Sequence, residues 1–475
     1  MTNDSGLSLP PFPSSYRASG LLLHVTSLPS PYGIGDVGPT AIAWINQLCD
    51  AGQSWWQALP LGPTGYGNSP YQSLSSFAGN GLLISPDWLI QDGLLRPSDC
   101  MAPPFSPSTV DYNAVIPFKH RLLEKAWTNF VRAGSAELRV AFGPNQVDQV
   151  CFAQFLLFRQ GARLEKHARA KGVRLIGDLP FFVSPDSSDV WANPELFLLD
   201  DQRRPRFVAG VPPDYFSAQG QLWGNPVYNW DTLRQTDYRW CIDRLRALLA
   251  HVDVIRLDHF RAFGAAWHVP AGALTAQSGQ WRPGPGADFF NAVRKELGGL
   301  PFIAEDLGLI TADVHALRDQ FQMPGTRVLQ FAFDGNSDNP YLPHNYTSNA
   351  VVYTGTHDNT TSRGWYEELA PHQRQNFWSY LNSPERNSRE VAWDLMHLAW
   401  SSPAALAIAP LQDLLNLGGQ ARMNIPGRAE GNWSWRCTED LLSAADFHWL
   451  RDLTRSSNRV GILANPAIEM AEAAV

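Results

Sequence analysis

The chain has little cysteine, with five in 475 residues. They are odd in number, lie far apart and form no Cys-x-x-Cys pair (Cys49, Cys100, Cys151, Cys241 and Cys437). This pattern argues against a disulfide framework and against a cysteine zinc site. It favours a reducing compartment, and we expect the protein to be cytoplasmic.

The chain also lacks a basic tract and a long hydrophobic run. Its formal net charge is -8 and its sequence pI is about 5.8, so it offers no positive field to a polyanion. The apolar run at 21–23 is too short for a signal-peptide core or a membrane span. We therefore expect no nucleic-acid partner and no membrane partner, and the sequence leaves the oligomeric state open.

Hydrophobic residues make up 44% of the chain and charged residues 17%, which is enough for a large buried core. Eight short apolar runs, each closed by polar or turn residues, predict strands. Most lack strict alternation of polar and apolar residues, as expected of strands covered on both faces. The runs are 21–25, 55–59, 173–176, 252–257, 301–304, 327–331, 350–353 and 406–408.

Stretches with helical spacing of apolar residues lie between these runs, at 150–171, 287–297, 312–321 and 390–400. Eight buried strands alternating with helices predict an α/β fold, the (β/α)8 TIM barrel. A doubly wound open sheet is the alternative.

The predicted strands are unevenly spaced along the chain, which points to inserted subdomains over the C-terminal face of the barrel. We expect them at about 62–149 and 181–240, segments rich in Pro, Gly, Trp and Tyr. Residues 1–19, rich in Ser and Pro, are expected to form a loose N-terminal arm. Residues 20–475 are then a single catalytic domain.

Three of the predicted strands are followed by a carboxylate, at Asp258, Glu305 and Asp358. Arg256 shares a face with Asp258 and would hold it ionised, as a nucleophile requires. Glu305, with an adjacent acid at position 306, can have the raised pKa of a proton donor. Retaining glycosidases use such a pair, and Asp358 beside His357 would grip sugar hydroxyls.

Other interpretations of these acids remain open. A carboxylate at a strand end can cap a helix or pair with Arg. A metal site is a second rival, but no close ligand spacing supports it. Its candidate ligands are Asp178, Asp258, Glu305 and His357.

Two further segments are candidates for binding. Gly33-Ile-Gly35-Asp-Val-Gly38 matches the dinucleotide pattern, but Pro29 and Pro31 separate it from the strand before it, which favours a tight turn. The segment 210–224 is long, rich in glycine and aromatic residues, and suited to be a lid that excludes water.

Several long motifs are distributed over about residues 20–436. They are His24-Val-Thr-Ser-Leu-Pro-Ser-Pro-Tyr-Gly-Ile-Gly-Asp, Ser69-Pro-Tyr-Gln, Gly177-Asp-Leu-Pro, Gly220-Gln-Leu-Trp-Gly-Asn-Pro, Arg256-Leu-Asp-His-Phe-Arg, Ala304-Glu-Asp-Leu-Gly, Thr356-His-Asp-Asn and Met423-Asn-Ile-Pro-Gly. Together these motifs resemble one known family, the 4-α-glucanotransferases of glycoside hydrolase family 77, also called amylomaltases or disproportionating enzymes.

The resemblance implies a (β/α)8 barrel with inserted subdomains, no cofactor and no catalytic metal. It makes Asp258 the nucleophile, Glu305 the acid/base and Asp358 the transition-state stabiliser. It also implies sugar or substrate-covering contacts at Ser69, Tyr71, Asp178, Asp214, Gln221, Trp223, Arg256, His357 and Asn424.

The implied reaction moves an α-1,4-glucan segment between maltooligosaccharides or glucans, or to glucose, and long donors can cyclise. An α-glucan hydrolase and a catalytically silent glucan-binding protein are the alternatives. Gln219 and Arg428 depart from the family pattern near expected glucan-contacting loops, which leaves acceptor preference and the ratio of transfer to hydrolysis open.

Overall fold

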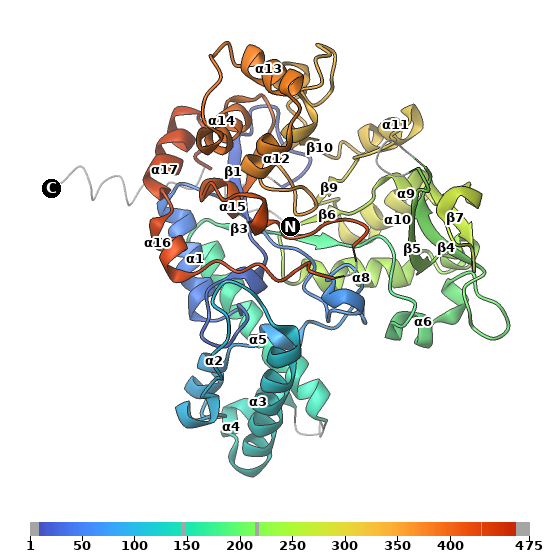
Figure 1. Ribbon diagram of the computed structural model, residues 1–475. Coiled ribbons are helices and arrows are strands. Elements are labelled where there is room, and N and C mark those ends of the chain that lie inside the picture. Colours follow the sequence, from blue (N-terminus) through green and yellow to red (C-terminus); the bar gives the residue numbers. More distant parts are fainter. Residues whose placement is uncertain (1–8, 144–147, 214–217, 429, 462–475) are drawn as a thin grey trace.

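The computed structural model describes residues 9–143, 148–213, 218–428 and 430–461. A closed barrel of parallel strands forms its centre, in the order β1-β12-β11-β10-β9-β6-β3-β2 (Figure 1). The barrel strands are β1 (Ala18–Leu22), β2 (Trp55–Gln57), β3 (Arg174–Leu179), β6 (Val254–Leu257), β9 (Phe302–Ala304), β10 (Gly325–Val328), β11 (Ala350–Tyr353) and β12 (Leu406–Pro410). The predicted (β/α)8 barrel is confirmed, and the open sheet is wrong.

Each predicted strand overlaps one barrel strand, but two are displaced. β1 begins at Ala18 rather than 21, because Gly20 lets it pack closely on β2: a Cβ there would lie 2.2 Å from the Trp55 carbonyl oxygen. β10 begins at Gly325, and residues 329–331 form a 3-10 turn instead of continuing the strand. Strands β1, β2, β6, β9, β11 and β12 are buried throughout, as expected of strands covered on both faces.

Helices lie outside the barrel strands (Figure 1). They include α1 (Pro39–Asp50), α5 (Gln149–Ala170), α8 (Arg239–Leu249), α10 (Gly286–Leu297), α11 (Ala312–Gln320), α12 (Ser362–Glu368), α13 (Pro371–Tyr380), α14 (Ser388–Ser401), α15 (Leu411–Leu414), α16 (Glu439–Ala444) and α17 (Phe447–Ser456). The four predicted helices correspond to α5, α10, α11 and α14. In α5, the Asp148 side chain caps the first turn, and Phe152, Leu156 and Leu164 are buried.

The segments expected to be insertions contain further elements. Residues 62–149 include α2 (Pro86–Gln91), α3 (Tyr112–Ala133) and α4 (Ala136–Phe142), which project as one lobe (Figure 1). Residues 181–240 include α6 (Ser188–Ala192), α7 (Trp230–Gln235), β4 (Phe207–Val211) and β5 (Gln221–Pro226). The latter two strands join β7 (Ala265–Pro270) and β8 (Gln280–Pro283) in an antiparallel sheet, ordered β5-β4-β7-β8. The division into a catalytic domain with two insertions stays a prediction.

The sequence predicted a loose arm up to residue 19, and this prediction is wrong for the residues of the arm that the structure describes. Phe12 and Tyr16 are buried and stack with ring centroids 4.7 Å apart, and the Tyr16 hydroxyl accepts a 2.9 Å hydrogen bond from the Trp55 indole. Arg17 donates to the carbonyls of Trp400 and Ser402. Residues 9–17 are therefore packed against the barrel, because their aromatic rings supply apolar surface that the core buries.

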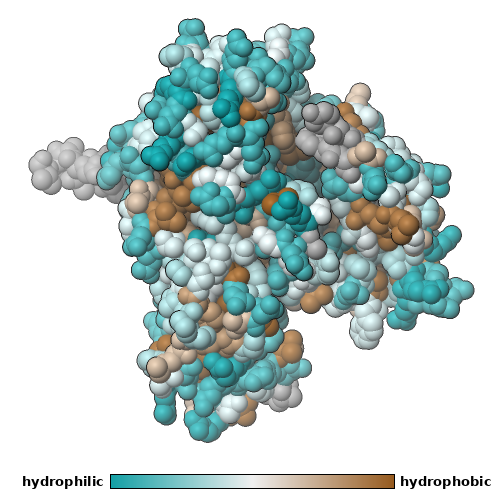
Figure 2. Space-filling model, viewed as in Figure 1, coloured by the Kyte–Doolittle hydropathy of each residue, from teal (hydrophilic) through white to brown (hydrophobic). Residues whose placement is uncertain are grey.

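The molecular surface has no apolar belt on the face drawn in Figure 2, where brown patches are separated by hydrophilic residues. Among the helices described, none is both long and apolar enough to cross a membrane.

Candidate active site

The three carboxylates predicted from the sequence all lie beyond the carboxyl ends of barrel strands. Asp258 directly follows β6 and Glu305 directly follows β9, whereas Asp358 lies in the loop after β11. β6 and β9 are neighbours, with Leu257 opposite Ala304, and the Glu305 N–H donates to the Leu257 carbonyl at 3.1 Å. Asp258 and Glu305 are thus brought side by side on the rim where active sites of this fold lie.

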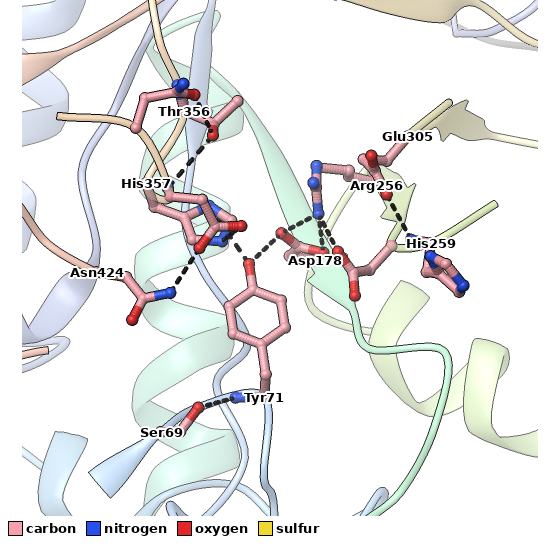
Figure 3. A network of polar contacts seen from close by, with 12 residues as sticks. Ser69, Tyr71, Asp178, Arg256, His259, Glu305, Thr356, His357 and Asn424 are labelled. Atoms are coloured by element: carbon pink, nitrogen blue, oxygen red, sulfur yellow. Dashed lines mark hydrogen bonds and ion pairs between the residues drawn. The ribbon is translucent and has the colours of Figure 1, made fainter. Parts of the chain in front are cut away.

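Arg256 joins two of the predicted acids. Its Nη1 lies 2.9 and 2.8 Å from the carboxylate oxygens of Asp178, and 2.9 Å from Oδ1 of Asp258 (Figure 3). Burial alone would lower the pKa of Arg256, but these carboxylates raise it well above its ordinary value. Asp178 is buried, whereas the Asp258 side chain remains 26% exposed. Arg256 therefore orients a carboxylate that still faces the open site.

Glu305 has a different environment. Its carboxyl oxygens accept hydrogen bonds from the backbone N–H groups of His259, at 2.7 Å, and Leu307, at 3.1 Å. Burial raises the pKa of Glu305 to about 8, and the charge of Asp258 adds to this, while Arg256 and the two N–H groups oppose it. A carboxyl group with this pKa keeps its proton near neutral pH, as a general acid must.

Asp358 is held by residues from two loops. The Asn424 amide donates to its Oδ1 at 2.6 Å, and Nε2 of His357 lies 3.4 Å from its Oδ2. The Arg422 guanidinium donates to its backbone carbonyl. The Asp358 side chain is 47% exposed, so it has room to contact a ligand.

Tyr71 connects the two halves of this cluster. Its hydroxyl donates to Oδ2 of Asp178 at 2.7 Å and lies 3.5 Å from Nδ1 of His357, and its ring stacks on the His357 ring at 5.0 Å (Figure 3). Ser69 Oγ accepts from the Tyr71 N–H at 3.2 Å. One continuous polar network therefore runs from Asp258 to Asp358.

The predicted lid is described in part. β5 carries Gln221 and Trp223, and the Trp223 indole donates to the Gln221 side chain at 3.2 Å. The Trp223 ring lies 4.9 Å from the ring of His259, the neighbour of Asp258. Asp214 lies outside the described residues. Gln219 and Arg428 are both exposed.

Sequence reasoning missed two residues of this site, Arg422 and Trp433. Trp433 lies 5.7 Å from the Tyr71 ring and 6.0 Å from the His357 ring, as centroid distances. Arg422 directly precedes the Met423-Asn-Ile-Pro-Gly motif, which was the available signal, and Trp433 comes later in the chain. Neither residue follows a predicted strand. Across the residues that the structure describes, no group of three or more His, Cys, Asp or Glu side chains could hold a metal ion.

A (β/α)8 barrel with a hydrogen-bonded carboxylate cluster on this rim has the architecture of an enzyme that processes glycosidic bonds. The family model described as 4-alpha-glucanotransferase, glycoside hydrolase family 77, matches residues 23–143 and 141–442. The chain belongs to this family, and it is a glycosyltransferase acting on α-1,4-glucans.

Relatives agree over nearly the whole length. The chain is 46% identical to a 4-alpha-glucanotransferase of Synechocystis sp., over 90% of this chain and 95% of that protein. It is 43% identical to one from Thermus thermophilus, over 94% and 99%. The amylomaltase of Streptococcus agalactiae in complex with acarbose superposes with a TM-score of 0.88 at 34% identity, over 93% of this chain and 99% of that one.

Proposed function

We propose that the enzyme transfers α-1,4-glucan segments with retention of configuration, through a covalent glycosyl-enzyme on Asp258. Glu305 is the acid/base and Asp358 stabilises the transition state. The observation that carries this proposal is the contrast between neighbouring carboxyls: Asp258 is paired with Arg256, while Glu305 has a pKa of about 8. One group is equipped to attack and the other to donate a proton.

In the first step, a carboxylate oxygen of Asp258 bonds to the anomeric carbon of the donor. The glycosidic bond breaks and its oxygen takes the proton of Glu305. In the second step, the Glu305 carboxylate removes a proton from the 4-hydroxyl of an acceptor, whose oxygen bonds to the anomeric carbon as the ester to Asp258 breaks. Neighbouring strands lie about 4.8 Å apart, which is compatible with the roughly 5 Å between carboxyls of a retaining pair.

In the transition state of each step the anomeric carbon develops positive charge, and Asp358 stabilises that charge. Its exposed carboxylate is positioned by Asn424 and His357 for contact with sugar hydroxyls. Further proposed sugar contacts are Ser69, Tyr71, Asp178 and Arg256. Asp214, Gln221 and Trp223 are proposed to cover the bound glucan and exclude water.

The proposed substrates are maltooligosaccharides, α-1,4-glucans and glucose, as donor or acceptor, and long donors also cyclise. The Streptococcus agalactiae amylomaltase is in complex with acarbose, which supports an oligosaccharide-like ligand for this chain. Burial lowers the pKa of Arg422, and the charge of exposed Arg428 adds to this effect, so Arg428 is proposed to affect acceptor choice. A cytoplasmic location is proposed from the cysteine pattern of the sequence.

Incubation with maltotriose tests the proposal. Transfer should yield glucose and a ladder of longer oligosaccharides, while the total concentration of reducing ends stays constant. An increase of reducing ends in step with bond cleavage would mean hydrolysis instead. Asp258→Asn should lower turnover by about 10⁴-fold or more with the fold intact, and unchanged turnover would rule out Asp258 as the nucleophile.

A further inference from the structure

Asp413 is a buried carboxylate outside the cluster described above. It lies in α15, which begins directly after β12, and it is 1% exposed. Its oxygens accept three hydrogen bonds: from the Thr354 hydroxyl at 2.6 Å, and from the backbone N–H and hydroxyl of Ser362 at 2.8 and 2.6 Å. Both partners are fully buried, so water does not compete for these bonds.

Thr354 and Ser362 are the two ends of the loop that carries Asp358. Thr354 directly follows β11, and Ser362 is the first residue of α12. One carboxylate therefore fixes both ends of the loop relative to β12. The chain packs closely beside this point, since a Cβ on Gly364 would lie 2.8 Å from Cα of Gly419.

The segment that begins with α15 also holds the tip of the same loop. The Gln412 amide donates to the Ala421 carbonyl at 3.2 Å, which ties α15 to the residues just before Arg422. Arg422 and Asn424 then bind the backbone carbonyl and the carboxylate of Asp358. The ends and the tip of the loop are thus held by one stretch of chain, residues 411–424.

We propose that Asp413 is a positioning residue for the reaction: by fixing loop 354–362 at both ends, it aims the Asp358 carboxylate at the reacting sugar. The proposal rests on the proposed role of Asp358. A misplacement of about 1 Å in a catalytic group can cost about 100-fold in rate. The competing interpretation is that Asp413 contributes only to stability.

Substitutions at Thr354 provide a matched pair. Thr354→Val keeps the side-chain shape but removes the hydroxyl that Asp413 binds, whereas Thr354→Ser keeps the hydroxyl. With maltotriose, kcat should fall by about tenfold or more in Thr354→Val and in Asp413→Asn, but stay within about twofold of wild type in Thr354→Ser. Equal losses in Thr354→Val and Thr354→Ser would overturn the proposal.

A double-mutant cycle tests whether Asp413 acts through Asp358. The Kd for acarbose, measured by calorimetry, remains accessible in variants that have lost turnover. Asp413→Asn should weaken acarbose binding by about tenfold in the wild-type background but by less than about twofold in Asp358→Asn, because residues coupled through a shared backbone shift give non-additive effects. The same weakening in both backgrounds would overturn the positioning role while leaving the role of Asp358 intact.

Two controls separate the remaining explanations. Asp253→Asn changes another buried carboxylate, which binds Arg174 at 2.6 Å just before β6, at the opposite end of the barrel. It should lower the melting temperature while leaving kcat and acarbose affinity unchanged; a loss of kcat like that of Asp413→Asn would overturn the proposal. Wild-type turnover in Asp358→Asn would instead refute the proposed function, and the positioning role with it.

Discussion

A single nitrogen of Arg256 contacts the carboxylates of Asp178 and Asp258, while Glu305 on the neighbouring strand is bound by two backbone N–H groups. At the scale of the residue, these different partners give the two neighbouring acids, Asp258 and Glu305, different chemical properties. The sequence predicted the three carboxylates because each follows an apolar run. It did not predict Arg422 or Trp433, whose loops reach the site only through the tertiary fold.

The pKa of Glu305 predicts the alkaline limb of the pH profile. Because the proposed role of Glu305 requires it to hold its proton until the sugar departs, kcat/KM for maltotriose should fall as pH rises through about 8. Measurement between pH 5 and 10 checks this. Glu305→Gln should lose the alkaline limb of the pH profile and most of its activity on maltotriose. It should retain a larger fraction of its activity with a glucosyl fluoride donor, because fluoride departs without a proton. An unchanged alkaline limb in Glu305→Gln would contradict the assignment.

The same shift predicts how stability changes with pH. The folded pKa of Glu305, about 8, lies above the ordinary value of 4.5, so between these pH values the native state holds a proton that the unfolded chain has lost. This group's contribution to stability is therefore present below about pH 4.5 and is lost as pH rises through about 8. The melting temperature of Glu305→Gln relative to wild type should increase from pH 5 to 8.5. A constant difference would count against the raised pKa.

At the scale of the element, the antiparallel sheet β5-β4-β7-β8 stands beside the barrel and was not predicted. For β8 the reason is physical: most of its residues are exposed, so its sequence lacks the apolar run by which the barrel strands were found. The barrel strands are largely buried and were predicted from their apolar runs. Two of their boundaries were predicted wrongly: the start of β1, which contains Gly20, and the end of β10, which is followed by a 3-10 turn.

In this sheet the Trp223 ring lies close to the His259 ring. We therefore expect Trp223 to limit the access of water to the site. In Trp223→Ala, the ratio of hydrolysis to transfer should rise by about threefold or more, because water gains access to the glycosyl-enzyme. The measurement compares new reducing ends with bonds cleaved in maltotriose. Leu222→Ala is the matched control, since this 42% exposed neighbour points to the opposite face of β5. Equal effects of the two substitutions would contradict the role of Trp223.

At the scale of the whole molecule, residues near both ends of the described chain support the seam where β1 pairs with β12. Arg459, which is fully buried, donates to the backbone carbonyls of Ala18, Ser402 and Ala404, where β1 meets β12. Phe12 and Tyr16 pack nearby against Trp55. The loose arm expected up to residue 19 was wrong for residues 9–17 because composition alone does not reveal which aromatic rings find a partner in the core.

Loss of Arg459 should therefore destabilise the molecule without changing its chemistry. Arg459→Ala should lower the free energy of unfolding by about 2–4 kcal/mol, because several buried carbonyls lose their donor. Scanning calorimetry measures this as a lower melting temperature, while kcat at 25 °C stays unchanged. Loss of kcat in folded Arg459→Ala would show that this end of the barrel affects the site.

The central claim is that Asp258 carries the glucan between donor and acceptor, and trapping the glycosyl-enzyme tests it most directly. Glu305→Gln, incubated with maltosyl fluoride and no acceptor, should form the ester but resolve it slowly, because no base activates the incoming hydroxyl. Peptide mass spectrometry should then find one maltosyl group on the peptide that contains Asp258. A maltosyl group on a different carboxylate, or product of inverted configuration with no labelled peptide, would contradict the account.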